Sequence, residues 1–512
     1  MTQSSIRARM LEAFRYRMFF FVTIAGIAFL IIIIQLINLQ LIQGKEYKIK
    51  SRLNMENYIP IPATRGEVYD RNYRFNKGGN VIVSSRPSFN IVTIPSKFKS
   101  ERKLKNVVMN LSDLLKIKYK DILQDIKSRN PWERAIIVED IGFDTVVKIA
   151  SHPYLFKNIY WEDAPVRVYN FNNMFSHVVG YIGTINKKEY HGLKKHGYKH
   201  YQKIGKSGIE KKYDKILRGR DGYVKRIVDV RNRTEGEEIG LRPVSGNNIV
   251  LSLDYEVQST VYKATENLKG AIIVSKPSTG EILALVSKPD YDPNKIISKN
   301  NIGIIRELLT NKNKPFINRV IQSKYPPAST FKIITAIAAL ETESTYPGKR
   351  YHCPGKYTLK GYIDKDFYDY RIHGTLDLYD AIAKSCCVYF YHLGYKIGPT
   401  SIMRYAGYLG LNKKTLIDLP GETQGFVPSK KWKLRRFGQS WFDGDTINMS
   451  IGQGFLNVTP IGMMNFISAI VNNGIVYKPV VVKEIRSPDN VKEVKGFTRE
   501  KIREIPLSPK TL

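Results

Sequence analysis

A serine followed three residues later by a lysine could supply a nucleophile and its base, and the pattern occurs at three places. The pairs are Ser96/Lys99, Ser100/Lys103 and Ser329/Lys332. The first two lie in a polar, lysine-rich stretch, where a lysine keeps its ordinary pKa and cannot act as a base. Ser329 directly precedes TFKIITAIAALE, whose apolar spacing predicts a buried helix. Context therefore favours the third pair.

Ser329 and Lys332 would share one face of that helix, so the lysine amine can reach the serine hydroxyl. The helix N-terminus favours negative charge that develops at the hydroxyl, and burial lowers the pKa of a lysine until it can accept a proton. The alternative is that Ser329 only caps the helix, because serine is preferred at that position. The local sequence is compatible with both interpretations.

A second set of reactive side chains surrounds the loop after this helix. The cysteines are Cys353, Cys386 and Cys387. A bridge between the adjacent pair would be strained, and a bridge from Cys353 to either is possible but cannot be deduced. Cys353, His373 and Cys386, with Asp364 or Asp366, form a set that can bind zinc tetrahedrally. Their spacing is not that of a recognised zinc motif, so packed or bridged side chains are the alternative. No other cofactor is predicted.

The N-terminal region predicts a membrane anchor. Residues 18–44 carry no charge and are long enough to span a bilayer as a helix. Because no convincing cleavage site follows, we expect an uncleaved anchor. Arg7, Arg9, Arg15 and Arg17 precede it, so the positive-inside rule predicts residues 1–17 in the cytoplasm and the rest outside.

The charge and composition exclude some classes of protein. The net charge is +35, but the basic residues are spread along the chain and the predicted topology places nearly all of them outside the cytoplasm, which argues against a nucleic-acid binder. The excess charge predicts attraction to anionic surfaces such as lipid headgroups or wall polymers. A length of 512 residues with 43% hydrophobic residues predicts two or three globular domains.

The elements that must position the candidate residues predict an α+β chain. Residues 45–240 contain strand-like pieces (NVIVSS, FNIVTI, RAIIVED) and the helix-like LKNVVMNLSDLLKI. Residues 241–512 contain a hairpin around PSTG, the Ser329 helix, and a helix that ends at SCC and then resumes. INMSIGQGFLNVTP is predicted to be a glycine-hinged loop. A sheet with helices, and a serine at a helix start facing that sheet, predicts an acyl-transfer fold.

Several segments, in order along the chain, resemble the landmarks of one family. They are RGEVYDRN, VRVYN, SHVVGYIG, GKSGIEKKYDKILRGRDG, GAIIVSKPSTGEILALVSKPDYDPN, YPPASTFK and GDTINMSIGQGFLNVTP. With them the chain resembles the class B penicillin-binding proteins of the elongation type, the penicillin-binding protein 2 group. The resemblance implies a single transmembrane helix at 18–44, an elongated α+β pedestal (dimerisation) domain at 45–240, and a transpeptidase domain at 241–512. The last has an antiparallel sheet flanked by helices, as in serine β-lactamases.

The resemblance also implies an activity, a peptidoglycan D,D-transpeptidase that cross-links stem peptides during cell-wall elongation. Ser329 would attack the carbonyl of the penultimate D-alanine while Lys332 takes its proton, and an amine of a neighbouring stem peptide would resolve the acyl-enzyme. Ser385 would relay a proton or orient Lys332, and β-lactams would acylate the same serine. The backbone N–H of Ser329 would supply half of an oxyanion hole.

The family further implies partners and a location. The partners are peptidoglycan stem peptides, β-lactams, the membrane, a multi-pass glycan polymerase and other elongation-complex proteins, with no nucleic acid. The location is the bacterial inner membrane, with the N-terminus cytoplasmic and most of the chain periplasmic.

The sequence departs from the family pattern at three points. Ala328 stands where the family usually has glycine, and Cys387 stands where it has asparagine or aspartate. The third motif, Lys-Thr-Gly or Lys-Ser-Gly, does not follow the IGQG loop, and Lys206-Ser207-Gly208 lies in the pedestal instead. We therefore expect the last strands and helix of the domain to be missing and the chain as given to be inactive or poorly folded. The alternatives are a non-catalytic membrane scaffold and a β-lactam-sensing or β-lactam-hydrolysing acyl-enzyme.

Overall fold

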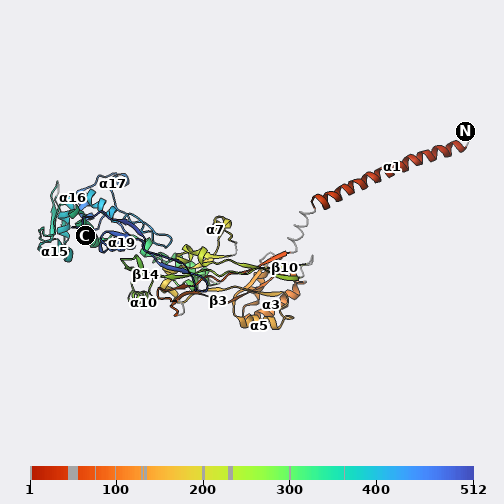
Figure 1. Cartoon of the computed structure of the whole chain (residues 1–512), viewed down its shortest axis with the longest axis horizontal. Helices are drawn as coiled ribbons and strands as arrows, with labels where there is room; N and C mark the ends of the chain where they lie inside the picture. Colours follow the sequence, from red (N-terminus) through yellow and green to blue (C-terminus); the bar gives the residue numbers. More distant parts are fainter. Residues whose placement is uncertain are drawn as a thin grey trace. The chain divides into compact units, whose positions relative to one another are not determined.

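The computed structural model describes most of the chain, and it divides into two compact units. The described residues are 3–43, 56–74, 77–98, 100–127, 131, 135–198, 202–228, 234–298, 301–361 and 364–512. The first unit comprises Met1–Pro62 and Asp221–Pro243, and the second comprises Ala63–Arg220 and Val244–Leu512. Figure 1 shows the elements of both units along the chain.

The first unit contains the predicted anchor helix and a small sheet. Helix α1 (Gln3–Ile37) continues into one π-helical turn, Asn38–Ile42. Within it, Met18–Leu41 is 24 residues long with a mean hydropathy of 2.8, and none of its most apolar stretch is buried by protein. That length and composition suit a membrane span. The sheet is antiparallel in the order β1 (Glu56–Ile61), β10 (Gly222–Val228) and β11 (Thr234–Leu241).

A six-stranded sheet in the second unit combines strands that are far apart in sequence. Its order is β21 (Glu493–Gly496), β20 (Val482–Arg486), β12 (Asn248–Leu251), β2 (Val68–Tyr69), β3 (Val81–Arg86) and β7 (Val166–Tyr169). Neighbouring strands are antiparallel except β12 and β2, which are parallel. All four residues of β12 are buried, as expected for a central strand that is covered on both faces. Strands from before and after residue 240 thus share one sheet.

Three pedestal motifs of the sequence, RGEVYDRN, VRVYN and GKSGIEKKYDKILRGRDG, meet in one buried ion-pair network. Arg65 Nε lies 2.6 Å from Glu210 Oε2, and Arg167 Nε lies 2.7 Å from Glu210 Oε1. Arg65 Nη2 also binds Asp214 at 2.7 Å. Burial alone would raise the pKa of Glu210, but the two guanidinium groups outweigh it and hold that pKa below its ordinary value. The network joins segments some 145 residues apart in sequence.

A separate layer of the pedestal packs helices on a three-stranded sheet. The strands, in the order β5 (Ala135–Ile141), β4 (Phe89–Thr93) and β6 (Ile159–Asp163), share an apolar core with α3 (Glu101–Leu115), α4 (Tyr119–Lys127) and α5 (Phe143–Ser151). Ser100 caps α3 by accepting from the backbone N–H of Lys103. The Ser100/Lys103 pair is therefore a helix cap, and Lys99 of the other rejected pair lies outside the described residues.

The part of the second unit after residue 250 contains the predicted hairpin and a helical layer. Strands β13 (Gly270–Lys276) and β14 (Glu281–Lys288) pair antiparallel around PSTG, as predicted. Helix α19 (Pro460–Val471) packs on β13, and α16 (Cys387–Tyr408) packs between α14 (Lys332–Glu341) and α18 (Asp443–Ser450). Ser329 lies at the start of the predicted helix, in a 3₁₀ turn, η5 (Ala328–Phe331), that leads directly into α14. One local prediction was wrong, because the INMS part of the predicted loop is helical in α18.

The remaining elements are short helices, strands and turns. In the pedestal they are η2 (Pro95–Lys97), η3 (Asn172–Phe175), α6 (Ser176–Val179), β8 (Ile182–Thr184), α7 (Lys187–Leu193), η4 (Lys194–His196), β9 (Lys203–Gly205), α8 (Gly208–Lys212) and α9 (Asp214–Leu217). After residue 250 they are α10 (Tyr255–Ala264), α11 (Pro293–Ile297), α12 (Ile302–Thr310), α13 (Arg319–Gln322), β15 (Tyr351–Cys353), β16 (Lys356–Leu359), β17 (Lys365–Tyr368), β18 (Gly374–Leu376), α15 (Leu378–Ala383), α17 (Lys430–Phe437), β19 (Ile475–Tyr477) and β22 (Lys501–Glu504).

Candidate active site

The candidate nucleophile sits on an exposed turn that a neighbouring loop holds in place. Ser329 is exposed, whereas Lys332 at the start of α14 is only 2% exposed. Ala328 N–H donates to the carbonyl of Gly452 at 3.0 Å, and Tyr325 and Val458 exchange two backbone hydrogen bonds of 2.9 Å. The IGQG loop therefore fixes the backbone on the N-terminal side of the serine.

Lys332 is directed at the second predicted motif. Its Nζ donates to the Ser385 carbonyl at 2.5 Å and to Ser385 Oγ at 3.1 Å, and it contacts Cys387 Sγ at 3.3 Å. The structure thus brings together Lys332 and Ser385, which are 53 residues apart in the chain. Among the described residues, no hydrogen bond joins Ser329 Oγ to either partner. In a structure without substrate, the hydrogen bond between a nucleophile and its base is often absent, so its absence does not exclude the predicted pair.

Ser385 adopts a backbone conformation that suits this role. Its φ is +51°, in the left-handed region, where non-glycine residues are uncommon and cluster at functional sites. The residue joins α15 to α16, and the Cys386 N–H just after it donates to the Ala381 carbonyl at 2.9 Å. The turn thereby presents both the carbonyl and the hydroxyl of Ser385 to Lys332.

Cys387 stands in the position where the resemblance leads one to expect an amide or a carboxylate. Burial raises the pKa of its thiol, and the neighbouring Lys332 offsets only part of that rise. The thiol is therefore neutral at neutral pH and a weak hydrogen-bond partner. Cys387 can fill the space beside Lys332 without reproducing the hydrogen bonds of an asparagine.

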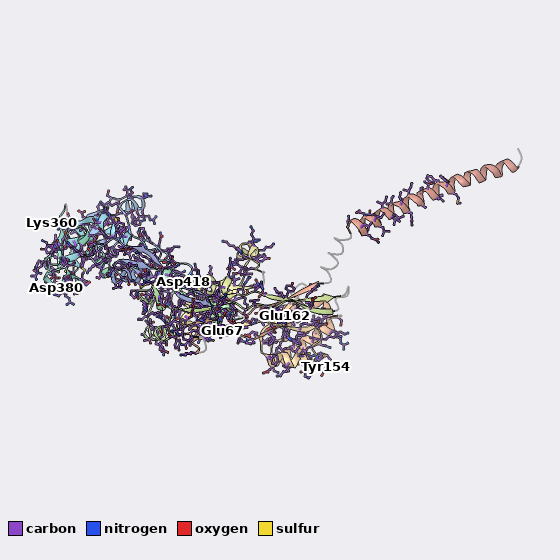
Figure 2. All side chains as sticks on the ribbon, viewed as in Figure 1. Glu67, Tyr154, Glu162, Lys360, Asp380 and Asp418 are labelled. Carbon is purple, nitrogen blue, oxygen red and sulfur yellow. The ribbon has the colours of Figure 1, made fainter. Side chains whose placement is uncertain are left out.

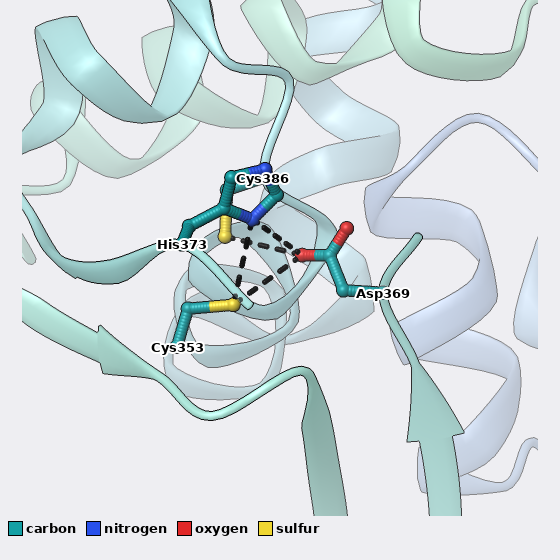
Figure 3. A group of neighbouring side chains, drawn as sticks. All are labelled: Cys353, Asp369, His373 and Cys386. Carbon is teal, nitrogen blue, oxygen red and sulfur yellow. Dashed lines mark hydrogen bonds and ion pairs between the residues drawn. The ribbon is translucent and has the colours of Figure 1, made fainter. Parts of the chain in front are cut away.

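A cluster of four potential metal ligands lies directly behind this site. The ligand atoms of Cys353, Asp369, His373 and Cys386 all lie within 4.8 Å of one another, and Figure 3 shows the side chains converging on a common point. The separations are 3.2 Å from Cys386 Sγ to Asp369 Oδ2, 3.5 Å from His373 Nδ1 to that oxygen, and 3.6 Å from Cys353 Sγ to both Asp369 Oδ2 and His373 Nδ1.

The carboxylate of the cluster is Asp369, which the sequence analysis did not propose. Asp364 and Asp366 point elsewhere, because each forms a 2.8 Å ion pair, with Lys360 and Lys356 respectively. The Asp366 pair lies across the β16–β17 hairpin. The four-residue spacing of Asp369 and His373 was the available signal for the correct carboxylate.

Asp369 also ties the cluster to the start of α16. Burial would raise the pKa of its carboxyl, but the Val388 N–H, the Cys386 thiol and His373 outweigh burial and leave that pKa below its ordinary value. Burial raises the pKa of the Cys386 thiol as well. Since Cys386 follows Ser385 and Val388 follows Cys387, the cluster fixes the backbone that carries the second motif.

Comparisons with known proteins agree with this architecture. Residues 60–251 match the penicillin-binding protein dimerisation domain, and residues 270–512 match the penicillin binding protein transpeptidase domain. Peptidoglycan D,D-transpeptidase MrdA of Acinetobacter baumannii is 32% identical over 475 residues, which cover 92% of this chain and 69% of the relative. MrdA of Salmonella typhimurium is 32% identical over 459 residues, 88% of this chain and 73% of the relative.

Solved structures give the same result. The complex of PBP2 and MreC from Helicobacter pylori matches with a TM-score of 0.74 at 27% identity, covering 85% of this chain and 80% of that chain. PBP2 of Pseudomonas aeruginosa matches with a TM-score of 0.63 at 28% identity, covering 89% of this chain and 78% of that chain.

An apolar N-terminal helix, a dimerisation domain and a transpeptidase domain in this order define a class B penicillin-binding protein. The chain belongs to the MrdA, or PBP2, family of that class. The family and the fold class predicted from the sequence are thereby confirmed.

Proposed function

We propose that this chain is a membrane-anchored peptidoglycan D,D-transpeptidase of cell-wall elongation that acts through an acyl-enzyme on Ser329. The observation that carries the proposal is Lys332 Nζ held at Ser385, with Lys332 three residues after the exposed Ser329. Members of the same family are named peptidoglycan D,D-transpeptidases. A serine nucleophile with an amine base is a complete acyl-transfer pair built from protein side chains alone.

The reaction follows from these positions. Ser329 Oγ attacks the carbonyl carbon of the penultimate D-alanine while its proton passes to Lys332 Nζ. The C–N bond then breaks, and terminal D-alanine leaves with a proton relayed through Ser385. An amine of a second stem peptide attacks the ester, gives its proton to the same side chains and restores the Ser329 hydroxyl. The N–H of Ser329 is a donor for the oxyanion in both halves.

Covalent labelling by a fluorescent penicillin tests this proposal. Because the third motif does not follow the IGQG loop, the full chain should be labelled slowly, as expected when one oxyanion donor is lost at a cost of about 10²–10³-fold in rate. Ser329→Ala should not be labelled, and Ser96→Ala should be labelled like the parent because Ser96 belongs to a rejected serine–lysine pair. Labelling that persists in Ser329→Ala, or no labelling of the parent, would contradict the assignment.

For the domain limits we propose residues 1–17 as a cytoplasmic tail, 18–44 as the anchor, 45–240 as the pedestal and 241–512 as the transpeptidase domain. The helix Met18–Leu41 supports the anchor, and the arginines before it support an N-terminus in the cytoplasm. Added protease should digest the chain after residue 44 in spheroplasts and leave an N-terminal tag intact. The opposite pattern would reverse the topology.

We also propose that the pedestal binds elongation-complex proteins, including a multi-pass glycan polymerase. In the Helicobacter pylori structure PBP2 is in complex with MreC, and another matching structure is described as a peptidoglycan synthase complex. Met109, Phe143, Val147 and Tyr154 are exposed on the layer of α3 and α5, and Figure 2 shows Tyr154 at the edge of that layer. We propose that these four side chains form one apolar patch, the kind of surface that marks protein interfaces.

Co-purification with the MreC homologue of the same cell tests the pedestal surface. Phe143→Ser/Tyr154→Ser should weaken capture, whereas Ile302→Ser/Leu309→Ser, which also changes two exposed apolar residues, should not. Equal capture by both variants would remove this surface from the proposal.

Finally, we propose that Cys353, Asp369, His373 and Cys386 hold a structural zinc ion. Ligands about 2.0–2.3 Å from a tetrahedral zinc lie roughly 3.3–3.8 Å apart, and the contacts of 3.2–3.6 Å come close to that range. Purified protein should contain about one equivalent of zinc. Cys353→Ser should lose it and Cys387→Ser should keep it, and the absence of zinc from the parent protein would end the proposal.

A further inference from the structure

Helix α17 presents a cationic and apolar surface and packs on Phe455, which follows the IGQG loop. Its exposed residues, with one aromatic residue that follows the helix, form what we call the basic helix face: Lys430, Lys431, Leu434, Arg435, Arg436, Phe437 and Phe442. Ser429 caps the helix through the Trp432 N–H, and Gly438 ends it at φ +68°. The face is thus carried on a helix with both ends defined.

The inner side of α17 carries one lysine, Lys433, whose charge is paired within the protein. Lys433 is 2% exposed, pairs with Asp445, and lies 4.2 Å from the ring of Phe442. In contrast, Lys430, Lys431, Arg435 and Arg436 form no ion pair with any described residue. Four uncompensated charges within seven residues repel one another, which a bound anion would relieve.

The basic helix face is coupled to the nucleophile turn through one aromatic residue. The rings of Trp432 and Phe437 pack on Phe455 with centroids 5.3 and 5.4 Å away. Phe455 follows the IGQG loop, whose Gly452 carbonyl accepts from the Ala328 N–H. A ring contact on Phe455 and the backbone hydrogen bond between Gly452 and Ala328 therefore connect α17 to the residue before Ser329.

We propose that the basic helix face binds the free carboxylates of peptidoglycan stem peptides and holds the substrate strand beside Ser329. The inference rests on the proposed function, because it takes its ligand from that reaction. Stem peptides that end in D-alanine carry a carboxylate, and arginine and lysine bind carboxylates directly. The exposed Leu434, Phe437 and Phe442 would cover the apolar parts of the same strand.

The contacts favour this ligand over an anionic lipid surface. Leu434, Phe437 and Phe442 are exposed, as apolar residues of a membrane-binding helix would be. The rings of Trp432 and Phe437, however, pack on Phe455 within the protein. The packing leads to the nucleophile turn, where a substrate must lie.

Co-sedimentation of the full chain with insoluble peptidoglycan tests the inference. Replacing Lys430, Lys431, Arg435 and Arg436 by glutamine should weaken binding about tenfold at low salt, and less at high salt because salt screens exposed charges. The matched control replaces the four exposed lysines of α7 and η4, namely Lys187, Lys188, Lys194 and Lys195. It removes the same charge and should change binding by less than about twofold.

Amidation of the peptidoglycan carboxylates supplies the second arm. It should weaken binding of the parent protein to the level of the α17 variant and leave the variant unchanged. Equal losses of peptidoglycan binding in the α17 and α7 variants would show that only net charge matters. A loss of binding by the α17 variant that appears only with anionic phospholipid vesicles would identify a membrane surface. Either result would overturn the inference. Failure of penicillin labelling in the parent protein would contradict the proposed function separately, since sedimentation does not require acylation.

Discussion

At the scale of single residues, the candidate site is defined by how Lys332 is held. A buried amine with its hydrogen bonds directed at Ser385 is confined to a narrow range of positions, and confinement of a base next to a nucleophile is a large part of acyl-transfer catalysis. The third contact of Lys332 Nζ is the neutral thiol of Cys387, which stands where the family has an amide or a carboxylate.

Lys332→Ala should lower the rate of acylation by penicillin about 10²–10⁴-fold, the usual contribution of a general base. Lys332→Arg should not restore it, because a guanidinium does not lose its proton in proteins. Acylation rates by stopped-flow fluorescence check this, with near-ultraviolet circular dichroism to show that the variants are folded. If Lys332→Arg acylates at the rate of the parent protein, residue 332 contributes a positive charge and does not act as a base.

Ala328 offers a test of backbone strain at the nucleophile turn. Its φ of +50° lies in the left-handed region, where a Cβ is unfavourable. Ala328→Gly relieves that contact at some cost in unfolded-chain entropy, so we expect a net gain of about 0.5–1 kcal/mol in the free energy of unfolding. Chemical denaturation measures the change. A loss of stability would show that the Ala328 methyl group packs favourably.

At the scale of elements, the pedestal strands and helices are joined by charge as well as by apolar packing. Glu210 in α8 is fully buried and is bound by two arginines, one preceding β2 and one in β7. A buried carboxylate between two guanidinium groups fixes the relative positions of these elements, because each charge is stable there only while its partners are present.

Glu210→Gln should cost about 3–5 kcal/mol, since two buried arginines lose their countercharge. Glu101→Gln is the control, because the Glu101–Lys127 pair is exposed and its loss should be close to neutral. Because the pKa of Glu210 is lowered by folding, its contribution is present above the unfolded pKa of about 4.3 and is lost as pH falls below that value. Denaturation between pH 3 and 7 should show a decline that Glu210→Gln lacks.

At the scale of the second compact unit, one carboxylate links the pedestal to the catalytic region. Asp418 accepts from Tyr213 Oη at 3.0 Å and from the backbone N–H groups of Val481 and Val482 at 2.7 and 2.9 Å. Figure 2 marks Asp418 within this unit. Tyr213 follows α8, and Val482 begins β20, so the three contacts hold together parts of the chain that lie more than 200 residues apart.

Asp418→Ala should cost about 2–6 kcal/mol, because two buried N–H groups lose their acceptor, whereas Tyr213→Phe should cost about 1 kcal/mol. Calorimetry should show the larger loss as one transition shifted to lower temperature if the pedestal and catalytic parts of the unit unfold together. Two separate transitions in Tyr213→Phe would instead assign the coupling to the tyrosine hydroxyl.

The sequence by itself determined the apolar N-terminal helix, the β13–β14 hairpin and the family, because each depends on residues close together in the chain, whereas the serine–lysine pair stays a prediction. Apolar length, alternation around a turn and motif spacing are local properties. The tertiary structure alone decided that Lys332 points at Ser385, that Asp369 and not Asp364 or Asp366 joins the cysteine–histidine cluster, and that β20 and β21 share a sheet with β2 and β3. Several carboxylates and several strands have the same local propensity for these positions. Only burial and hydrogen-bond pairing in the folded chain decide which carboxylate joins the cluster and which strands pair.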